Sequence, residues 1–232
     1  MFSFCRNRGL ENNFTKGSTV FMAVYVLALG RPGSGKSTAA RYMLERAENL
    51  GWNTTRLKDY DMLYKMFQTD IRGRFQPAAY GGFDVVEFSV LDEVLVELQR
   101  KALEEVPPEG NDLVIIEFAR NDYEEALQRF KRWFLREAYI LYVEADVETC
   151  IERIHKRISC PDRPDNHFVS DNILRGYYGR DNRSYMREQF CKDFDVDCGH
   201  IQVIKNDGLQ IEFLHKIDQF LTNVMQKVLV PA

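Results

Sequence analysis

The chain has 232 residues, 45% of them hydrophobic, and its 31 Lys and Arg against 35 Asp and Glu leave a formal net charge of -4. This length favours one α/β domain over two, and the slight acidity argues against broad, sequence-independent binding to nucleic acid. The five cysteines form no Cys-x-x-Cys pair, which is typical of a protein from a reducing cytoplasm.

Residues 1–20 carry several basic and amide side chains without apolar periodicity, so we expect them to form a flexible arm. The arm lacks the apolar core and the cleavage site of a signal peptide. The apolar run that starts at Val20 is too short to span a bilayer. We therefore expect residues 21–232 to form a single cytoplasmic domain that does not bind a membrane.

The first apolar segment, residues 20–29, has the composition of a strand buried on both faces. A helix is expected over residues 37–50, where apolar residues recur at spacings of three and four before Gly51. The segment between them fits the pattern G-x-x-x-x-G-K-[ST] at every fixed position. Its residues, with the threonine that follows, are Gly30, Arg31, Pro32, Gly33, Ser34, Gly35, Lys36, Ser37 and Thr38.

This glycine-rich segment predicts the binding of a nucleoside triphosphate. The backbone N–H groups of such a loop surround the phosphates, and Lys36 can reach the β and γ oxygens. The hydroxyl of Ser37 can bind Mg²⁺. A strand, a glycine loop and a helix follow one another in the order that this chemistry requires, so we predict ATP and Mg²⁺ as cofactors.

Residues 52–58 are expected to form a second strand, which ends before Asp59 and Asp61. Either carboxylate could act as a catalytic base that orients the acceptor. The same pair also arises in loops simply because Asp tolerates loop geometry, so a structural role stays open. A helical apolar stripe follows over residues 62–67.

The acceptor-binding region is expected within about residues 60–105. Residues 71–82 have no clean period and are interpreted as a substrate-side loop, and residues 84–106 are expected to form a long helix. Arg72 and Arg74 lie in this loop and suggest an anionic acceptor. Loop arginines are more often only solvated, so both interpretations stay open.

Residues 113–116 form a third apolar strand, and Glu117 follows at its end. This acid could bind Mg²⁺ through water, or it could accept the proton of an acceptor hydroxyl. The alternative is a structural carboxylate that caps the next loop and pairs with Arg120.

Strands and helices continue to alternate to the end of the chain. The expected elements are a helix over 121–137 with Asn121 and Glu124 as a capping pair, a strand over 139–143, a helix over 147–158 capped by Asp146, a strand over 201–204 and a final amphipathic helix. This alternation predicts a three-layer α/β fold, a parallel sheet with helices on both faces. Ligands of such sheets bind at the carboxyl ends of the strands, so the polar residues there should meet in one crevice.

Residues 153–187 hold eight basic residues against four acidic ones, although the whole chain is acidic. Arg153 and Arg157 are four positions apart on one expected helix and project from the same face. Arginine grips phosphate oxygens with a planar fork that stays charged, so the segment predicts an arginine-rich lid. The alternative is a solvated basic face with Asp partners.

The chain resembles the nucleotide-kinase-like P-loop phosphotransferases, a group of nucleoside, nucleotide and small-molecule kinases. The resemblance rests on the glycine-rich segment, on Arg153 and Arg157, and on Asn206-Asp207-Gly208 before the last helix. It implies a five-stranded parallel sheet in the order 2-3-1-4-5, an acceptor region between strands two and three, and a lid over ATP. It also implies that Arg153 packs on the adenine, that Arg157 contacts the transferred phosphate, and that Asn206, Asp207 and Gly208 lie by the base.

The stretch Glu117-Phe118-Ala119-Arg120 looks similar to deoxynucleoside kinases. There, a strand-end Glu activates the acceptor hydroxyl and an Arg steadies the acceptor, which implies those roles for Glu117 and Arg120. The chain departs from monophosphate kinases because it lacks a D-G-[FY]-P-R stretch after the third strand, so a plain adenylate kinase is not expected.

We therefore predict an ATP-dependent phosphotransferase that moves the γ-phosphoryl group to a small hydroxyl- or phosphate-bearing acceptor. A toxin-like or polynucleotide-directed kinase and an ATP-binding sensor without turnover are the alternatives. A regulatory GTPase is excluded because no N-K-x-D loop occurs. We expect a monomer or homodimer that forms no stable complex with nucleic acid.

Overall fold

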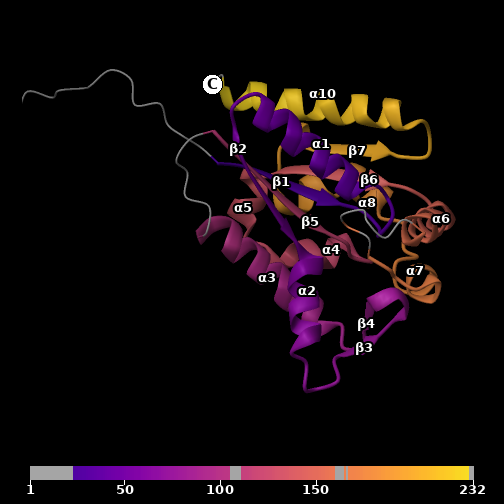
Figure 1. The fold of residues 1–232 in the computed structure, drawn as a ribbon. Helices are drawn as coiled ribbons and strands as arrows, with labels where there is room; N and C mark the ends of the chain where they lie inside the picture. The colour runs from indigo at the N-terminus through magenta and orange to yellow at the C-terminus, as the bar shows by residue number, and fades with distance from the viewer. Residues whose placement is uncertain (1–22, 105–110, 160–164, 166, 230–232) are drawn as a thin grey trace, which may run out of the picture.

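The computed structural model describes residues 23–104, 111–159, 165 and 167–229, so the arm predicted for residues 1–20 lies outside the described residues. Its centre is a parallel sheet of five strands in the order β2-β5-β1-β6-β7 (Figure 1). These strands are β1 (Ala23–Leu29), β2 (Asn53–Lys58), β5 (Asp112–Phe118), β6 (Tyr139–Glu144) and β7 (Ile201–Lys205). They are the first to fifth strands of this sheet along the chain, so the predicted order 2-3-1-4-5 is confirmed.

Helices cover both faces of the sheet, as predicted. The helices α1 (Lys36–Asn49) and α10 (Gln210–Leu229) lie together on one face, at the top of Figure 1. The opposite face carries α3 (Ser89–Glu104), α4 (Tyr123–Ala126), α5 (Arg132–Glu137), α8 (Arg183–Glu188) and α9 (Phe190–Phe194). Within the described residues, no helix is long and apolar enough to cross a bilayer.

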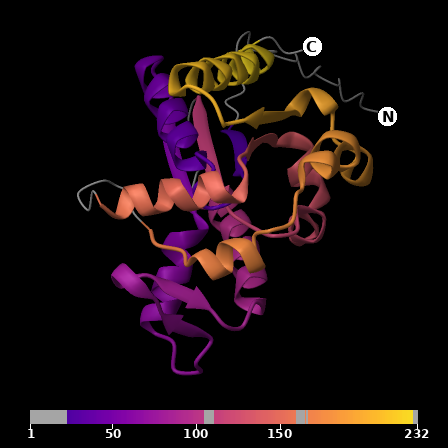
Figure 2. The same ribbon diagram turned by 90° about the vertical axis from the view of Figure 1, so that its right-hand side faces the viewer.

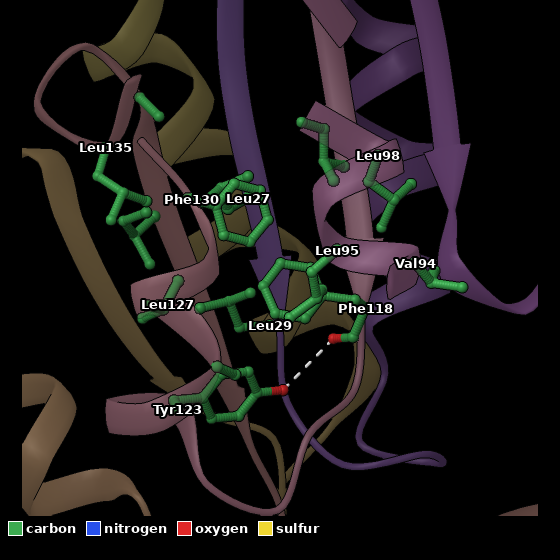
Figure 3. Close-up of a cluster of buried hydrophobic side chains, with 14 of the residues drawn as sticks. Leu27, Leu29, Val94, Leu95, Leu98, Phe118, Tyr123, Leu127, Phe130 and Leu135 are labelled. Atoms are coloured by element: carbon green, nitrogen blue, oxygen red, sulfur yellow. Dashed lines mark hydrogen bonds between the residues drawn. The ribbon is translucent and has the colours of Figure 1, made fainter. Parts of the chain in front are cut away.

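Two apolar cores form because β1 and β5 are buried on both faces. Val26 and Ala28 of β1 point into the core beneath α1 and α10. Leu27 and Leu29 point into the core on the other side, where Phe118 and the helix α3 pack (Figure 3). All seven residues of β5 are buried, as the continuous apolar run of a central parallel strand requires.

The segment between β2 and β5 differs from the prediction. Residues 71–82 do not form only a loop, because β3 (Phe75–Pro77) pairs with β4 (Phe83–Val85) in an antiparallel hairpin. The expected helix over 84–106 begins only at Ser89. Phe75 and Phe83 pack edge to face with ring centroids 5.6 Å apart, which stabilises the hairpin. This packing outweighs the helical spacing of apolar residues that predicted a longer helix.

The helix expected over 121–137 is also interrupted. It is divided into α4, a 3₁₀ turn (Leu127–Arg129) and α5. Asp122, and not Asn121, caps α4, because its carboxylate accepts a hydrogen bond from the backbone N–H of Glu125. The predicted cap at Asp146 is confirmed, since its carboxylate accepts from the N–H of Thr149 at 2.8 Å.

The remaining helices surround the carboxyl ends of the strands. They are α2 (Asp59–Gln68), α6 (Val147–Ile158) and α7 (Asp171–Gly176). Figure 2 shows α6 and α7 side by side, between α1 and the hairpin of β3 and β4. The polar residues that follow β1, β2 and β5 therefore face a region walled by these helices.

Candidate active site

The loop between β1 and α1 has a backbone that only glycine can form. Gly30 has φ 140°, and a Cβ there would lie 2.2 Å from the carbonyl oxygen of Val143. Gly35 has φ 112°, and a Cβ there would lie 2.3 Å from Nδ2 of Asn206. Both positions combine a positive φ with a close approach, so the two fixed glycines of the motif are explained by this geometry.

Lys36 begins α1 and is buried at the loop. Its ammonium group donates a hydrogen bond to the carbonyl oxygen of Arg31 at 2.8 Å. Burial lowers the pKa of Lys36, although the nearby carboxylates of Glu117 and Asp59 oppose this shift. The cation is thus held at the loop, where a phosphate group would meet it.

Ser37 and Glu117 meet across the two central strands. The register of β1 with β5 sets Ala28 opposite Glu117, so the carboxylate reaches the start of α1. The hydroxyl of Ser37 donates to Oε1 of Glu117 at 2.5 Å. These are hard oxygen donors of the kind that Mg²⁺ prefers. Within the described ranges, no cluster of three His, Cys, Asp or Glu that could hold a metal ion is found.

The other oxygen of Glu117 is bound by an arginine of the edge strand. Arg56 donates to Oε2 from Nη2 at 2.5 Å and from Nε at 3.2 Å. The partner proposed for Glu117, Arg120, is therefore wrong. Strand β2 lies beside β5 in the sheet, which brings Arg56 within reach although it is 61 positions away.

The glycine loop lies between two cavities. The larger, about 660 Å³, is lined by the loop, the face of α6 and the start of α10. The smaller, about 130 Å³, is lined by α2, β4, α7 and the segments that follow β5 and α7. Both cavities are lined by Gly33, Lys36, Ser37, Arg157 and Asp165.

Arg153 and Asn206 form one wall of the larger cavity. Arg153 donates to the carbonyl oxygens of Asn206 at 2.8 Å and Ser34 at 3.4 Å, and Asn206 donates from Nδ2 to the same Ser34 oxygen at 2.7 Å. Gly208 also lines this cavity. Asp207 does not line it and instead pairs with Lys205 in solvent.

Arg157 lies at the junction of the two cavities. Its Nη1 donates to the backbone oxygen of Asp165 at 3.2 Å, and its buried Nε has no hydrogen-bond partner among the described residues. An arginine with a free donor at the junction can contact a group that passes from one cavity to the other.

Asp165 is a site residue that sequence reasoning missed. Its carboxylate accepts hydrogen bonds from Arg41, from Arg56 at 3.0 Å and from Lys58 at 3.1 Å. Burial opposes ionisation, but Arg56 and Lys58 lower the pKa of Asp165 to about 2. Its partners lie more than 100 positions away, so no spacing in the sequence could have indicated them.

Asp59 and Asp61, the two other acids predicted for the site, differ in their positions relative to the cavities. Asp59 lines the smaller cavity, and its Oδ2 accepts from the N–H of Ala119 at 3.1 Å and from Nη1 of Arg120 at 2.7 Å. Arg120 is buried and also donates to the carbonyl oxygen of Leu91, so it holds Asp59 and does not line the cavity itself. Asp61 is 53% exposed, pairs with Lys58 and lines neither cavity.

Arg72 and Arg74 are not brought to either cavity. Arg72 is exposed, and Arg74 pairs with Asp70 and Glu93. Aromatic side chains occupy the walls of the smaller cavity instead, among them Tyr60.

The side chain of Arg31 binds backbone oxygens of the protein. Its guanidinium donates to the backbone oxygens of Ala145 at 2.9 Å, Tyr178 at 2.7 Å and Arg180 at 2.7 Å, with a longer bond to Gly179. Its side chain is therefore not free for nucleotide, although the backbone of Arg31 remains part of the predicted phosphate loop. It ties the glycine loop to the segment after α7.

Several arginines of the predicted lid bind acids of the fold rather than line the larger cavity. Arg175 pairs with Glu148, Arg180 with Asp122 and Arg183 with Glu144. The basic residues of residues 153–187 that do line the larger cavity are Arg153, Lys156 and Arg157.

Tyr123 binds the backbone at the start of the glycine loop, and it was not identified from the sequence. Its buried hydroxyl accepts from the N–H of Gly30 at 2.7 Å and from the N–H of Arg120 at 3.3 Å. It lies 3.3 Å from the carbonyl oxygen of Phe118, to which it can donate (Figure 3). One side chain thus fixes the ends of β1 and β5 relative to each other.

The glycine loop lies between a parallel strand and a helix, with Lys36 and Ser37 at the start of the helix. Glu117 lies on β5, the neighbouring strand of the sheet. This arrangement defines a nucleotide-kinase-like P-loop protein. The family model described as AAA domain matches residues 26–190, and the chain belongs to this family. A search of the curated proteins finds no significant match to the sequence.

Solved structures with the same fold cover most of the chain. Kti12 of Chaetomium thermophilum, in complex with ADP-AlF3, is 16% identical and has a TM-score of 0.50, with 86% of this chain and 98% of that chain covered. APS kinase CysC of Mycobacterium tuberculosis, in complex with AMPPNP and APS, is 13% identical with the same TM-score and coverage. At these identities the likeness shows the fold.

Proposed function

We propose that this protein is an ATP-dependent phosphotransferase that moves the γ-phosphoryl group to a small acceptor with Mg²⁺. The observation that carries the proposal is the contact of Ser37 with Glu117 at the junction of two cavities, beside Lys36. A transfer reaction needs separate places for donor and acceptor, with phosphate-binding groups between them. The nucleotide and APS named for APS kinase CysC agree with such an arrangement.

The larger cavity is the proposed site of ATP. Its phosphates would lie against the backbone of residues 33–38 and Lys36, and its base would lie near Arg153, Asn206 and Gly208. Ser37 and, through water, Glu117 would hold Mg²⁺, which neutralises charge on the phosphates when bound.

The smaller cavity is the proposed site of the acceptor. Glu117 lines it and would accept the proton of the acceptor hydroxyl, while Lys36 and Arg157 stabilise the charge on the transferred group. Glu117 is preferred over Asp59 as the base because its carboxylate contacts Ser37 of the glycine loop, whereas the carboxylate of Asp59 binds Arg120 and the N–H of Ala119. Asp59 is proposed to position the loop after β5.

Replacement of Glu117 by glutamine tests the proposed base. We expect Glu117→Gln to bind MgATP within about twofold of the wild-type affinity and to release ADP about 10² to 10³ times more slowly, because an amide cannot take the proton. A coupled ADP-release assay over nucleosides, monophosphates, sugars and polyol acids, with calorimetry for ATP, measures both. Asp61→Asn is the matched control, because Asp61 lies outside both cavities.

Unchanged turnover in Glu117→Gln would contradict the role of Glu117 as base. Lys36→Ala examines the donor side in the same assay, and we expect it to lower turnover about 10² to 10³ fold. ATP binding by the wild-type protein without ADP release for any acceptor would contradict phosphotransfer and indicate a sensor.

A further inference from the structure

The walls of the smaller cavity are rich in aromatic side chains, which phosphoryl transfer alone does not require. Aromatic rings from α2, β4 and the segments around α7 line it, including Tyr60, Phe83, His167, Phe168 and Tyr178. Tyr60 is stacked on His167 with centroids 3.3 Å apart and on Phe83 with centroids 5.4 Å apart. Flat rings of this kind bind a planar ligand by stacking, with little dependence on its charge.

The charges around this cavity disfavour an anionic acceptor. Among the described lining residues the cations are Lys36 and Arg157, and both also line the larger cavity, where the donor phosphates are proposed. Away from that junction the cavity is lined by Asp84, whose carboxylate accepts one hydrogen bond in the described part of the chain, from Ser170 at 3.5 Å. An acceptor carboxylate or phosphate there would face a negative charge without a cation of its own.

Two polar groups of the lining residues have unused hydrogen-bonding capacity. The buried Nε2 of His167 has no hydrogen-bond partner among the described residues, and Asp84 can accept a further hydrogen bond. An aliphatic polyol would satisfy these groups but would gain no stacking from the aromatic rings that line the cavity. A ring that contains nitrogen satisfies both the stacking surface and the polar groups.

We propose that the acceptor is an uncharged nitrogen heteroaromatic compound with a hydroxyl group, such as a nucleoside, whose ring lies against Tyr60 and whose hydroxyl reaches Glu117. This rests on the proposed function. The acceptor oxygen forms a bond to the γ-phosphorus as the bond from that phosphorus to the β-bridging oxygen breaks. The hydroxyl proton passes to Glu117, and ADP leaves with the electron pair of the broken bond.

Acceptor specificity of the wild-type protein tests this directly. The assay compares ADP release with uridine, adenosine and pyridoxine against gluconate, shikimate, glycerol and AMP. We expect kcat/KM to be at least tenfold higher for the best heteroaromatic alcohol than for any aliphatic or anionic compound. A preference for an aliphatic or anionic compound would overturn this inference and leave the phosphotransferase proposal standing.

Binding measured without turnover separates the two proposals. Saturation-transfer NMR and calorimetry with the same probes, in the presence of a non-hydrolysable ATP analogue, should detect saturable binding of a heteroaromatic compound. We expect Tyr60→Leu to weaken that binding roughly tenfold, as loss of a stacking partner does, and Tyr60→Phe to retain it. Tyr42→Leu is the matched control, because Tyr42 lies on α1 and does not line the cavity.

Melting temperatures of the three variants show whether each remains folded. Binding without ADP release would support the heteroaromatic pocket and contradict phosphotransfer. Absence of binding for all heteroaromatic probes at millimolar concentration, with an intact melting transition, would overturn the inference.

Discussion

The imidazole of His167 lies against Tyr60, near Lys58. Burial, and then the charge of Lys58, lower the pKa of His167 to about 4 from an ordinary value of 6.5. The ring is therefore neutral at pH 7. In the unfolded chain the same ring takes up a proton near pH 6.5, so protonation favours the unfolded state as the pH falls from 6.5 towards 4.

This shift predicts a loss of stability in a defined pH range. The free energy of unfolding should fall by on the order of 2–3 kcal/mol between pH 7 and pH 4 because of His167. His167→Phe keeps an aromatic ring without the proton and should lack this part of the loss. Urea unfolding at pH 7, 5.5 and 4 measures it, and parallel curves for the two proteins would contradict the assigned environment.

Asp165 acts in a separate pH range. Its folded pKa of about 2 lies below its ordinary value of 3.8, so its contribution is present above that value and is lost as the pH falls towards 2. The two residues can therefore be distinguished in one titration of stability.

The glycine loop is held in place by hydrogen bonds from its side chains to segments far away in the sequence. Arg31 donates to the backbone oxygens of Tyr178, Gly179 and Arg180, which follow α7. Charge-assisted hydrogen bonds of this kind contribute more than neutral ones, so their loss should destabilise the segment that they hold.

Arg31→Gln should loosen the segment after α7. We expect faster amide hydrogen exchange over residues 177–183 and a loss of about 3 kcal/mol in the free energy of unfolding. Arg46→Gln is the control, because Arg46 makes an exposed ion pair with Asp218 at 2.9 Å, a kind of contact that contributes little to stability. Exchange unchanged in Arg31→Gln would show that the segment is held by other contacts.

At this scale the sequence predicts some elements and misses others for physical reasons. The motif from Gly30 to Ser37, the five sheet strands and the cap at Asp146 depend on patterns within about ten residues, and all are found. The hairpin of β3 and β4 escapes because three-residue strands are too short to show a period. Its stability comes from aromatic packing, which the sequence does not reveal.

The partners of the site residues were harder to predict than the residues themselves. Glu117 and Lys36 could be found because Glu117 lies near the end of an apolar strand and Lys36 lies within the motif. Glu117 pairs with Arg56, and Asp59 pairs with Arg120. Both pairs depend on the order of the strands in the sheet, which brings residues far apart in the sequence within contact distance. Asp165 depends on contacts with Arg41, Arg56 and Lys58, which no local pattern encodes.

The whole molecule should become more stable when nucleotide binds. A ligand that binds only the folded state adds about 2.7 kcal/mol at a concentration 100 times its dissociation constant. For a chain of this size that corresponds to a rise of several degrees in melting temperature. Thermal unfolding with MgATP and with MgADP measures it. Lys36→Ala should reduce the shift, and an equal shift in that variant would contradict the proposed phosphate site.

The two cavities share part of their lining, namely Gly33, Lys36, Ser37, Arg157 and Asp165. A substitution at any of these positions changes the lining of both cavities at once. Under the proposed assignment of donor and acceptor, these residues would couple the two preferences. Substitutions on the far wall, where Tyr60 and Phe83 lie, would then change acceptor preference with the least effect on the nucleotide.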